Sequence, residues 1–353
     1  MGNLDEALQR FHVGHLEYAG GLANHGPMAA EALERLGHQA LIPAFLGLYA
    51  PRLPIAEKGR TLSEDEASEA LGEIARAADW VATYETRLEK GDWRSVVAAS
   101  VPKLIPGLFA GAGHGFLRTA HALRSLEACD SPLRRRELAH GLAYWSARYR
   151  PLPGRLGCGA LRPTEGLASL ADWPQLGEAV SRVGFLSDSV RRLDSFPEFS
   201  EAIERLALPE PTEVDAFLGG LCSAAASLYI DHPDARIVYV HALTIPSAAR
   251  LVAAYLSEAE ACLLAAAVFQ ATLAIHSIYG EKKSAIESDS EVDRISGNWD
   301  EIRYHAACSL DEHAIKMVEA CWREYQIHED PVFMRAAADA ALKIDARGRI
   351  AAC

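Results

Sequence analysis

One segment of the chain, from Ala261 to Ile278, is apolar almost throughout. The S-x-x-E spacing of Ser257 and Glu260 just before it is that of a capping box, which predicts the start of a helix. A helix that is apolar on every side has to be surrounded by other protein or by lipid. The capped start and the lack of about 20 uninterrupted apolar residues favour protein. The segment therefore predicts a core helix inside a large helical domain, and no membrane span.

Helical periodicity extends over most of the remaining chain. Apolar side chains recur at three- and four-residue steps from Ser63 to Glu89 and again from Pro211 to Ile230. Alternating patterns typical of strands are few, and Arg236 to Val240 is the best short candidate. The polar stretch from Lys282 to Gly297 predicts a solvated loop. These patterns predict a mainly α fold in which residues 1–353 form a single large helical domain.

The charge balance limits what the protein binds. The 35 Lys and Arg residues against 48 Asp and Glu residues leave a net charge of −13, which disfavours binding to nucleic acid or to an anionic membrane. The first 30 residues contain several acidic side chains and no apolar signal-type segment, and the seven cysteines show no C-x-x-C spacing. We therefore expect a cytoplasmic protein with reduced thiols. The oligomeric state stays open.

Most of the 13 histidines have ordinary interpretations. Six lie among polar residues, near turns or beside proline, and are predicted at the surface: His12, His15, His38, His140, His232 and His328. Three lie on predicted helices with apolar neighbours, where a lone histidine is typically hydrogen-bonded within the core: His121, His276 and His305.

Three further histidines occupy well-defined corners of the predicted helices. His25 follows Asn24 and precedes Pro27, residue types that favour a helix start. His114 comes directly after a glycine-rich turn and opens another helix. His241 ends an apolar run that is predicted to be buried.

The thirteenth histidine, His313, comes with an unusual neighbour. Lys316 lies three residues later, so both side chains project from one helical face. Apolar residues follow Lys316 and predict that it is buried, which requires a partner or a lowered pKa. Neutral imidazole is the commonest metal ligand, and several imidazoles from separate helices would form a metal site between helices. Spacing alone leaves their convergence open, and purely structural histidines remain the alternative.

The ordered set of these segments resembles the questin oxidase family, whose members oxidise polyketide anthraquinones and related aromatic products of secondary metabolism. The matching pieces span nearly the whole chain: Asn24-His25, His114-Gly115-Phe116-Leu117-Arg118, His241-Ala242-Leu243-Thr244 and Glu312-His313-Ala314-Ile315-Lys316. This chain is shorter than the fungal members and differs from them around Arg118 and His121, so its substrate is expected to differ as well.

The resemblance implies a mononuclear non-haem Fe(II) centre that uses O2 to cleave or oxidise, in a Baeyer–Villiger-like way, a ring of an aromatic or quinone-type small molecule. Carried over motif by motif, it implies His25, His114, His241 and His313 as metal ligands. It further implies that Lys316 is carboxylated and completes the ligand set, which makes Lys316 and His313 the residues expected to matter most for catalysis. A carbamate with several imidazoles forms a mixed nitrogen and oxygen site that suits Fe(II).

Five other side chains are candidates for the substrate pocket: Arg118, His121, Thr244, His276 and Tyr279. The run Gly111-x-Gly113-x-Gly115 follows a helix-like segment and predicts a tight turn before a helix, not a dinucleotide-binding loop. A requirement for NADPH would then be met by a partner reductase. Two alternatives stay open: a metal-independent NADPH-dependent Baeyer–Villiger monooxygenase, and a non-catalytic helical binding protein.

Overall fold

The computed structural model describes residues 2–177, 185–281 and 289–344. Within these ranges the chain forms eighteen α-helices, several short 3-10 turns and one two-stranded sheet. The predicted mainly α fold is confirmed. One continuous apolar core includes residues from Leu4 to Ile344, so both ends of the described chain contribute to it.

The helices vary from a single turn to six turns. In chain order they are α1 (Asn3–Phe11), α2 (Gly26–Arg35), α3 (Ile42–Tyr49), α4 (Glu64–Glu69), α5 (Ala77–Lys90), α6 (Trp93–Leu104), α7 (His114–Ala128), α8 (Pro132–Ala147), α9 (Pro163–Ala168), α11 (Leu186–Ser189), α12 (Pro197–Glu204), α13 (Val214–Asp231), α14 (Arg236–Ala253), α15 (Glu258–Tyr279), α16 (Ser290–Ile295), α17 (Trp299–Ser309), α18 (Glu312–His328) and α19 (Pro331–Lys343). The sheet is an antiparallel pair, β1 (Glu17–Tyr18) with β2 (Leu22–Ala23).

The apolar segment that begins after Ser257 is the core helix α15. Ser257 and Glu260 form the predicted capping box, in which each side chain binds the backbone N–H of the other residue. Two helical segments among the described residues, Pro211–Asp231 and α15, are long and apolar enough to span a membrane. However, 89% of the apolar window of α15 is buried inside the protein, against 50% for the other segment. The apolar composition of α15 is therefore explained by its position in the protein core.

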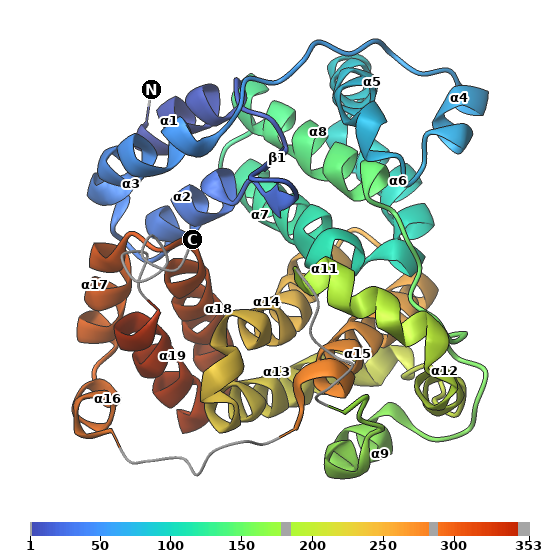
Figure 1. Cartoon of the computed structure of the whole chain (residues 1–353). Coiled ribbons are helices and arrows are strands. Elements are labelled where there is room, and N and C mark those ends of the chain that lie inside the picture. Colours follow the sequence, from blue (N-terminus) through green and yellow to red (C-terminus); the bar gives the residue numbers. More distant parts are fainter. Residues whose placement is uncertain (1, 178–184, 282–288, 345–353) are drawn as a thin grey trace.

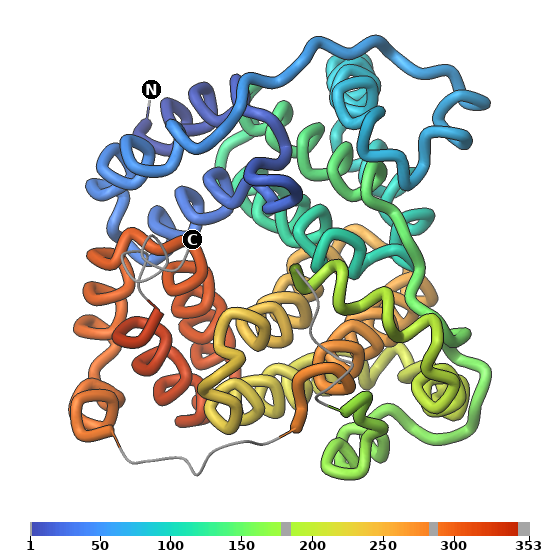
Figure 2. The backbone as a smooth tube through the Cα atoms, viewed as in Figure 1, coloured from blue at the N-terminus to red at the C-terminus, as the bar shows by residue number. Residues whose placement is uncertain are grey.

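Four helices from different parts of the sequence form a closed ring. α2 packs against α7, α7 against α14, α14 against α18, and α18 returns to α2. Figure 1 shows these helices around the middle of the molecule, with α13 and α15 beside α14. The tube in Figure 2 makes clear that the blue N-terminal helix α2 lies beside the red-orange helix α18, although nearly the whole chain separates them.

Three sequence-based expectations about elements are wrong. The helix expected from Ser63 to Glu89 is interrupted, because the chain turns at Gly72 with a φ of +84° and divides into α4 and α5. Arg236 to Val240 is no strand: it forms the first turns of α14, because this short apolar run is one face of a longer helix. Of the predicted loop from Lys282 to Gly297, residues 282–288 lie outside the described ranges, and Ser290 to Ile295 form α16.

Candidate metal centre

Each helix of the ring supplies one histidine near the centre of the molecule. His25 immediately precedes α2, His114 is the first residue of α7, and His313 is the second residue of α18, so three imidazoles lie at helix N-termini. His241 lies in the second turn of α14. The positive end of a helix dipole disfavours a protonated imidazole, which suits these three rings to the neutral form.

Local sequence explains why the helices begin where they do. The side chain of Asn24 accepts a hydrogen bond from the N–H of Gly26 at 3.0 Å, and Pro27 stands in the first turn of α2. Asp311 caps α18 by accepting from the N–H groups of His313 and Ala314 at 2.8 and 3.2 Å. His25 itself is the N-cap residue of α2 and the Asn24 bond closes the turn before it, whereas Asp311 caps α18 with its side chain, and these contacts fix the positions of His25 and His313.

Before α7 the chain makes a tight turn in place of a side-chain cap. Gly111, Ala112 and Gly113 all have positive φ values, of 58°, 58° and 76°. The predicted turn is confirmed, and it places the carbonyl of Gly111 beneath the ring of His114.

The four imidazoles converge. Their ligand atoms all lie within 4.8 Å of one another, and all four residues are buried, with exposed fractions between 3% and 7%. Ring centroids are 4.4 Å apart for His25 and His114, 4.8 Å for His25 and His313, and 4.8 Å for His114 and His241. A buried group of this kind could hold a metal ion.

Backbone carbonyls fix the orientation and tautomer of three rings. The Nδ1 atoms of His25, His114 and His241 donate to carbonyl oxygens of Ala23, Gly111 and Ile237 at 2.5, 2.6 and 2.9 Å. A carbonyl oxygen only accepts, so in each neutral ring Nδ1 carries the hydrogen and Nε2 presents a lone pair. This is the arrangement by which proteins typically orient metal-binding histidines.

The inward-facing nitrogens match the requirements of a cation. The Nε2 atoms of His114 and His241 are 3.1 Å apart, and with both Nδ1 atoms protonated their two lone pairs face each other. Two nitrogens bound to one ion at about 2.0–2.1 Å lie about 2.8–3.4 Å apart, for angles between a right angle and a tetrahedral one. The buried Nε2 of His25 has no hydrogen-bond partner among the described residues. A shared cation would satisfy all three atoms.

Electrostatics favour neutral imidazoles in this group. Burial is the largest cause that lowers the pKa of His25 and His114 well below 6.5, followed by the positive charges of Lys316 and the neighbouring histidines. Both rings are therefore in the ligand form at neutral pH.

Lys316 lies beside the four histidines. It is 2% exposed, as predicted, and projects from α18 one turn after His313. Its charge acts on both His25 and His114. Two acidic side chains lie near His313: a carboxylate oxygen of Asp311 is 3.8 Å from Nδ1 of His313, and one of Glu312 is 3.7 Å from the same atom.

The five candidate pocket residues are more dispersed. Thr244 follows His241 by one turn, is 5% exposed, and donates its hydroxyl to the carbonyl of Val240 at 2.8 Å. The other four side chains engage partners of their own: Arg118 with Glu137, His121 with Glu31, His276 with Tyr239, and Tyr279 with Ser189. Of the ten candidate residues, the five proposed ligands and the five pocket candidates, the structure brings together the four histidines and Lys316.

Sequence reasoning missed a group of buried charged side chains that connects three helices of the ring. The Arg124 guanidinium donates to Glu31 at 2.8 Å and also pairs with Glu319, which joins α7 to α2 and α18. His121 binds the same Glu31 at 2.8 Å. Glu31 stands within an otherwise apolar stripe of small residues in the sequence, and a lone carboxylate on an apolar face is the signal that would have revealed a buried partner.

A second missed residue is Tyr49 of α3. Its hydroxyl accepts a hydrogen bond from the backbone N–H of His25 at 2.7 Å, and so it supports the turn that carries His25. Burial is the main cause that raises the pKa of Tyr49 well above 10, and the phenol stays protonated.

Three histidines predicted at the surface are buried. His12, His140 and His232 are 3%, 3% and 5% exposed, so polar sequence neighbours were a poor guide. Hydrogen bonds explain two of them, since His12 binds Glu137 and His232 reaches the carbonyls of Leu228 and Gly280. His121 and His276 are hydrogen-bonded core residues, as predicted.

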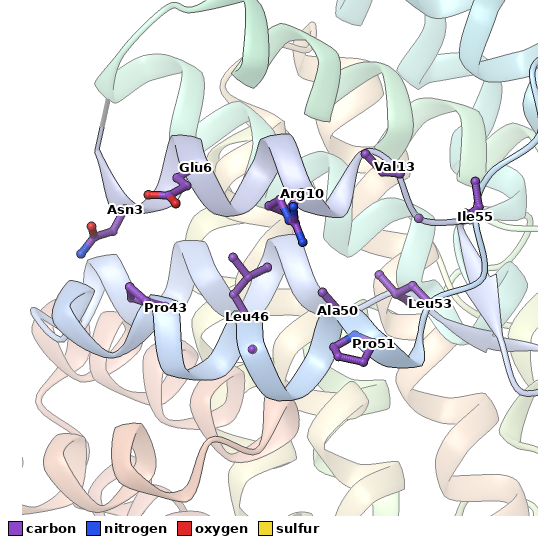
Figure 3. Close-up of a pocket in the computed structure, with 12 residues that line it drawn as sticks. Asn3, Glu6, Arg10, Val13, Pro43, Leu46, Ala50, Pro51, Leu53 and Ile55 are labelled. Carbon is purple, nitrogen blue, oxygen red and sulfur yellow. The ribbon is translucent and has the colours of Figure 1, made fainter.

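A groove elsewhere on the molecule lies between α1 and α3. It has a volume of about 680 Å³, and Figure 3 shows Glu6 and Arg10 on α1 opposite Leu46 and Pro51. None of the four central histidines lines it.

Comparison with known proteins identifies no relative, so the functional argument rests on the buried histidine group. No protein-family model and no curated protein matches this chain.

Proposed function

We propose that the protein is a mononuclear non-haem iron-dependent oxygenase that oxidises or cleaves a ring of an aromatic or quinone-type small molecule. The observation that carries the metal part of this proposal is the convergence of four buried imidazoles within 4.8 Å. The reaction type and substrate class come from the resemblance to the questin oxidase family. Fe(II) bound by these groups would supply the electrons with which O2 is activated.

The proposed ligands are His25, His114, His241 and His313. Fixed Nδ1–H groups direct the Nε2 lone pairs of the first three inward, so little reorganisation is needed when a metal binds. An imidazole set of this size suits Fe(II) but also Zn(II) or Cu(II), and an anionic oxygen ligand would shift the preference towards iron.

Lys316 is the proposed source of that oxygen ligand. Its neutral amine attacks CO2, an N–C bond forms, and one proton is released, which leaves a carbamate anion. The burial of Lys316, which is 2% exposed, favours the neutral amine over the ammonium ion. The negative carbamate would offset part of the metal charge at a site where few water molecules reach.

Metal analysis tests the first part of the proposal. Protein purified under anaerobic conditions should contain about one iron per chain, and His313→Ala should lose both the iron and the turnover of a quinone-type substrate. His328→Ala is the matched control, because His328 ends the same helix at the surface. Wild-type protein that binds no transition metal would end this proposal and favour a helical binding protein.

A second experiment separates the metal-dependent mechanism from its alternative. Substrate-dependent oxidation of NADPH that persists after complete chelation would favour a metal-independent Baeyer–Villiger monooxygenase. Loss of turnover on chelation, restored by Fe(II) alone, supports the iron-dependent reaction.

The role of Lys316 has its own readout. Protein equilibrated with ¹³C-bicarbonate should show one carbamate resonance that Lys316→Ala removes and Lys103→Ala retains, since Lys103 is exposed on α6. A carbamate signal that persists in Lys316→Ala would contradict the assignment.

A further inference from the structure

A second pair of buried histidines lies where the end of α1 meets α8. His12 caps the C-terminus of α1, His140 lies in α8, and both are 3% exposed. Their ring centroids are 4.7 Å apart. Both rings line a small cavity of about 60 Å³, which His15 and Glu57 also line. The cavity is large enough for an ion with one or two water molecules.

A carboxylate and an arginine fix the tautomer of His12. Nε2 of His12 lies 2.9 Å from Glu137 Oε2, and Arg118 donates to both oxygens of Glu137 at 2.5 and 2.8 Å. Burial opposes ionisation of Glu137, but the charge and hydrogen bonds of Arg118 outweigh it and hold the pKa of Glu137 below 4.5. An ionised carboxylate only accepts, so Nε2 of His12 carries the hydrogen and Nδ1 presents a lone pair.

The lone pairs of this pair are unused. Nδ1 of His12 and both ring nitrogens of His140 are buried and have no hydrogen-bond partner among the described residues. Burial lowers the pKa of both rings, so each is neutral and each offers one lone pair. Buried nitrogens without partners are costly, and a ligand that accepts electron pairs would remove that cost for Nδ1 of His12 and for the one nitrogen of His140 that carries a lone pair.

The preference for a cation over an anion comes from the lone pairs and not from the surrounding charge. Arg118 and Arg136 act on both rings with positive charge, and Arg136 lines the cavity, but each arginine is paired, Arg118 with Glu137 and Arg136 with Glu85 at 2.6 Å. A carboxylate oxygen of Glu85 lies 4.0 Å from Nε2 of His140. An anion would find the lone pair of His12 pointing towards it, whereas a metal ion would bind that lone pair directly.

We propose that His12 and His140 bind a divalent transition-metal ion such as Zn²⁺ in this cavity, at a site separate from the four-histidine centre. The arrangement of Glu137 behind His12 is that of a carboxylate orienting a metal-binding histidine. Glu57 at the cavity wall, or water, would complete the coordination. Glu137 and His140 also carry the E-x-x-H spacing that places a carboxylate and an imidazole on one helical face.

The site can be tested with Zn²⁺ alone in competition with a chromophoric chelator. The His25→Ala/His114→Ala/His313→Ala variant, which leaves one imidazole of the central group, should bind one Zn²⁺ per chain. His140→Gln in that background should bind Zn²⁺ at least tenfold more weakly. His328→Ala in the same background should keep the Zn²⁺. Equal stoichiometry and affinity with and without His140→Gln would overturn the proposal.

Crystals of the wild-type protein soaked in Zn²⁺ provide a measurement that does not depend on a variant folding. Anomalous scattering should show a peak about 2.0–2.1 Å from a ring nitrogen of each of His12 and His140. A Zn²⁺-soaked crystal with a peak at the central histidines and none at this cavity would also overturn the proposal. The two sites share no ligand. A failure to bind metal at the His12 and His140 cavity therefore says nothing against the four-histidine centre, and the reverse holds as well.

Discussion

At the residue scale, the central histidines depend on backbone atoms more than on side chains. The carbonyls of Ala23, Gly111 and Ile237 hold three of the rings, and no side-chain substitution removes these acceptors directly. The geometry of the centre is therefore a property of the turns and helix ends that present these carbonyls.

Buried neutral histidines make stability depend on pH. The pKa values of His25, His114 and His140 are held well below 6.5, with burial as the largest cause. Below pH 6.5 the unfolded chain binds protons that the folded chain does not, so the free energy of unfolding should fall as the pH falls. Each histidine should contribute up to about 1.4 kcal/mol per pH unit.

Urea unfolding of metal-free protein at pH 7.5, 6.5 and 5.5 measures this slope. Carboxylates with lowered pKa, such as Glu137, act only below their unfolded value near 4.5 and do not contribute in this range. His140→Gln should reduce the dependence of the unfolding free energy on pH by the contribution of one histidine, up to about 1.4 kcal/mol per pH unit. An unfolding free energy that is constant from pH 7.5 to 5.5 would refute the prediction.

The sequence predicted individual residues unevenly. The helix start at His25 was predicted from Asn24 and Pro27, and it is present although His25 and not Asn24 is the N-cap residue; the start at His313 follows from the Asp311 cap, so in both cases local sequence was sufficient. The burial of His12 depends on Glu137, 125 residues away in the chain, and no local pattern carries that pairing. Convergence of the central group required the fold itself.

At the element scale, the crossing of α7 and α8 depends on two glycines. A Cβ added to Gly115 would lie 2.4 Å from the backbone Cα of Trp145, and one added to Gly141 would lie 2.8 Å from the backbone N of Thr119. The two helices therefore approach until their backbones are nearly in contact. Gly115 directly follows His114, so this packing also positions a proposed ligand.

Gly115→Ala should separate α7 from α8. Overpacking of a close helix crossing costs about 1–3 kcal/mol or more, and the shift of α7 should also weaken metal binding. Gly47→Ala is the matched control within a helix, because a Cβ there meets nothing within 4 Å. That control should stabilise the protein by about 0.5–1 kcal/mol, and thermal unfolding of both variants checks the contrast. Equal stability of the two variants would contradict the close crossing.

Helix patterns predicted where apolar faces lie better than where helices end. The capped start at Ser257 was predicted and is present, because a capping box is a local signal. The break at Gly72 was missed because a single glycine is compatible with both a helix interior and a turn. Arg236 to Val240 was assigned to a strand because five residues are too few to distinguish the two periods.

At the scale of the whole molecule, buried ion pairs connect the ring of helices. Arg124 on α7 pairs with Glu31 on α2 and Glu319 on α18, and the side chains of all three are at most 10% exposed. Glu319→Gln should cost about 3–5 kcal/mol, because it leaves part of a buried charge uncompensated. Arg155→Ala, in an exposed pair with Glu204, should change stability by less than about 1 kcal/mol. Urea unfolding of both variants measures the difference, and a small effect of Glu319→Gln would contradict this role.

Metal binding should stabilise the molecule as a unit, because the four proposed ligands come from segments that span most of the chain. A metal ion at 100 times its dissociation constant should raise the free energy of unfolding by about 2.7 kcal/mol. The measurement is urea unfolding with and without Mn²⁺ in the His140→Gln variant, which isolates the central site. The gain should disappear in His140→Gln/His313→Ala, and a gain that persists there would place the ion elsewhere.

The order of the ligands along the chain also has a consequence for biosynthesis. His25 is separated from His313 by 288 residues, and at roughly 5–20 residues per second a ribosome needs about 15–60 s to synthesise that stretch. α2 and α7 are both synthesised within this interval, but the ring that α18 closes does not form until its end. Ribosome-bound chains that stop before α18 should therefore carry three of the four histidines and still fail to retain iron. Under the proposed function, loading of iron would therefore follow translation.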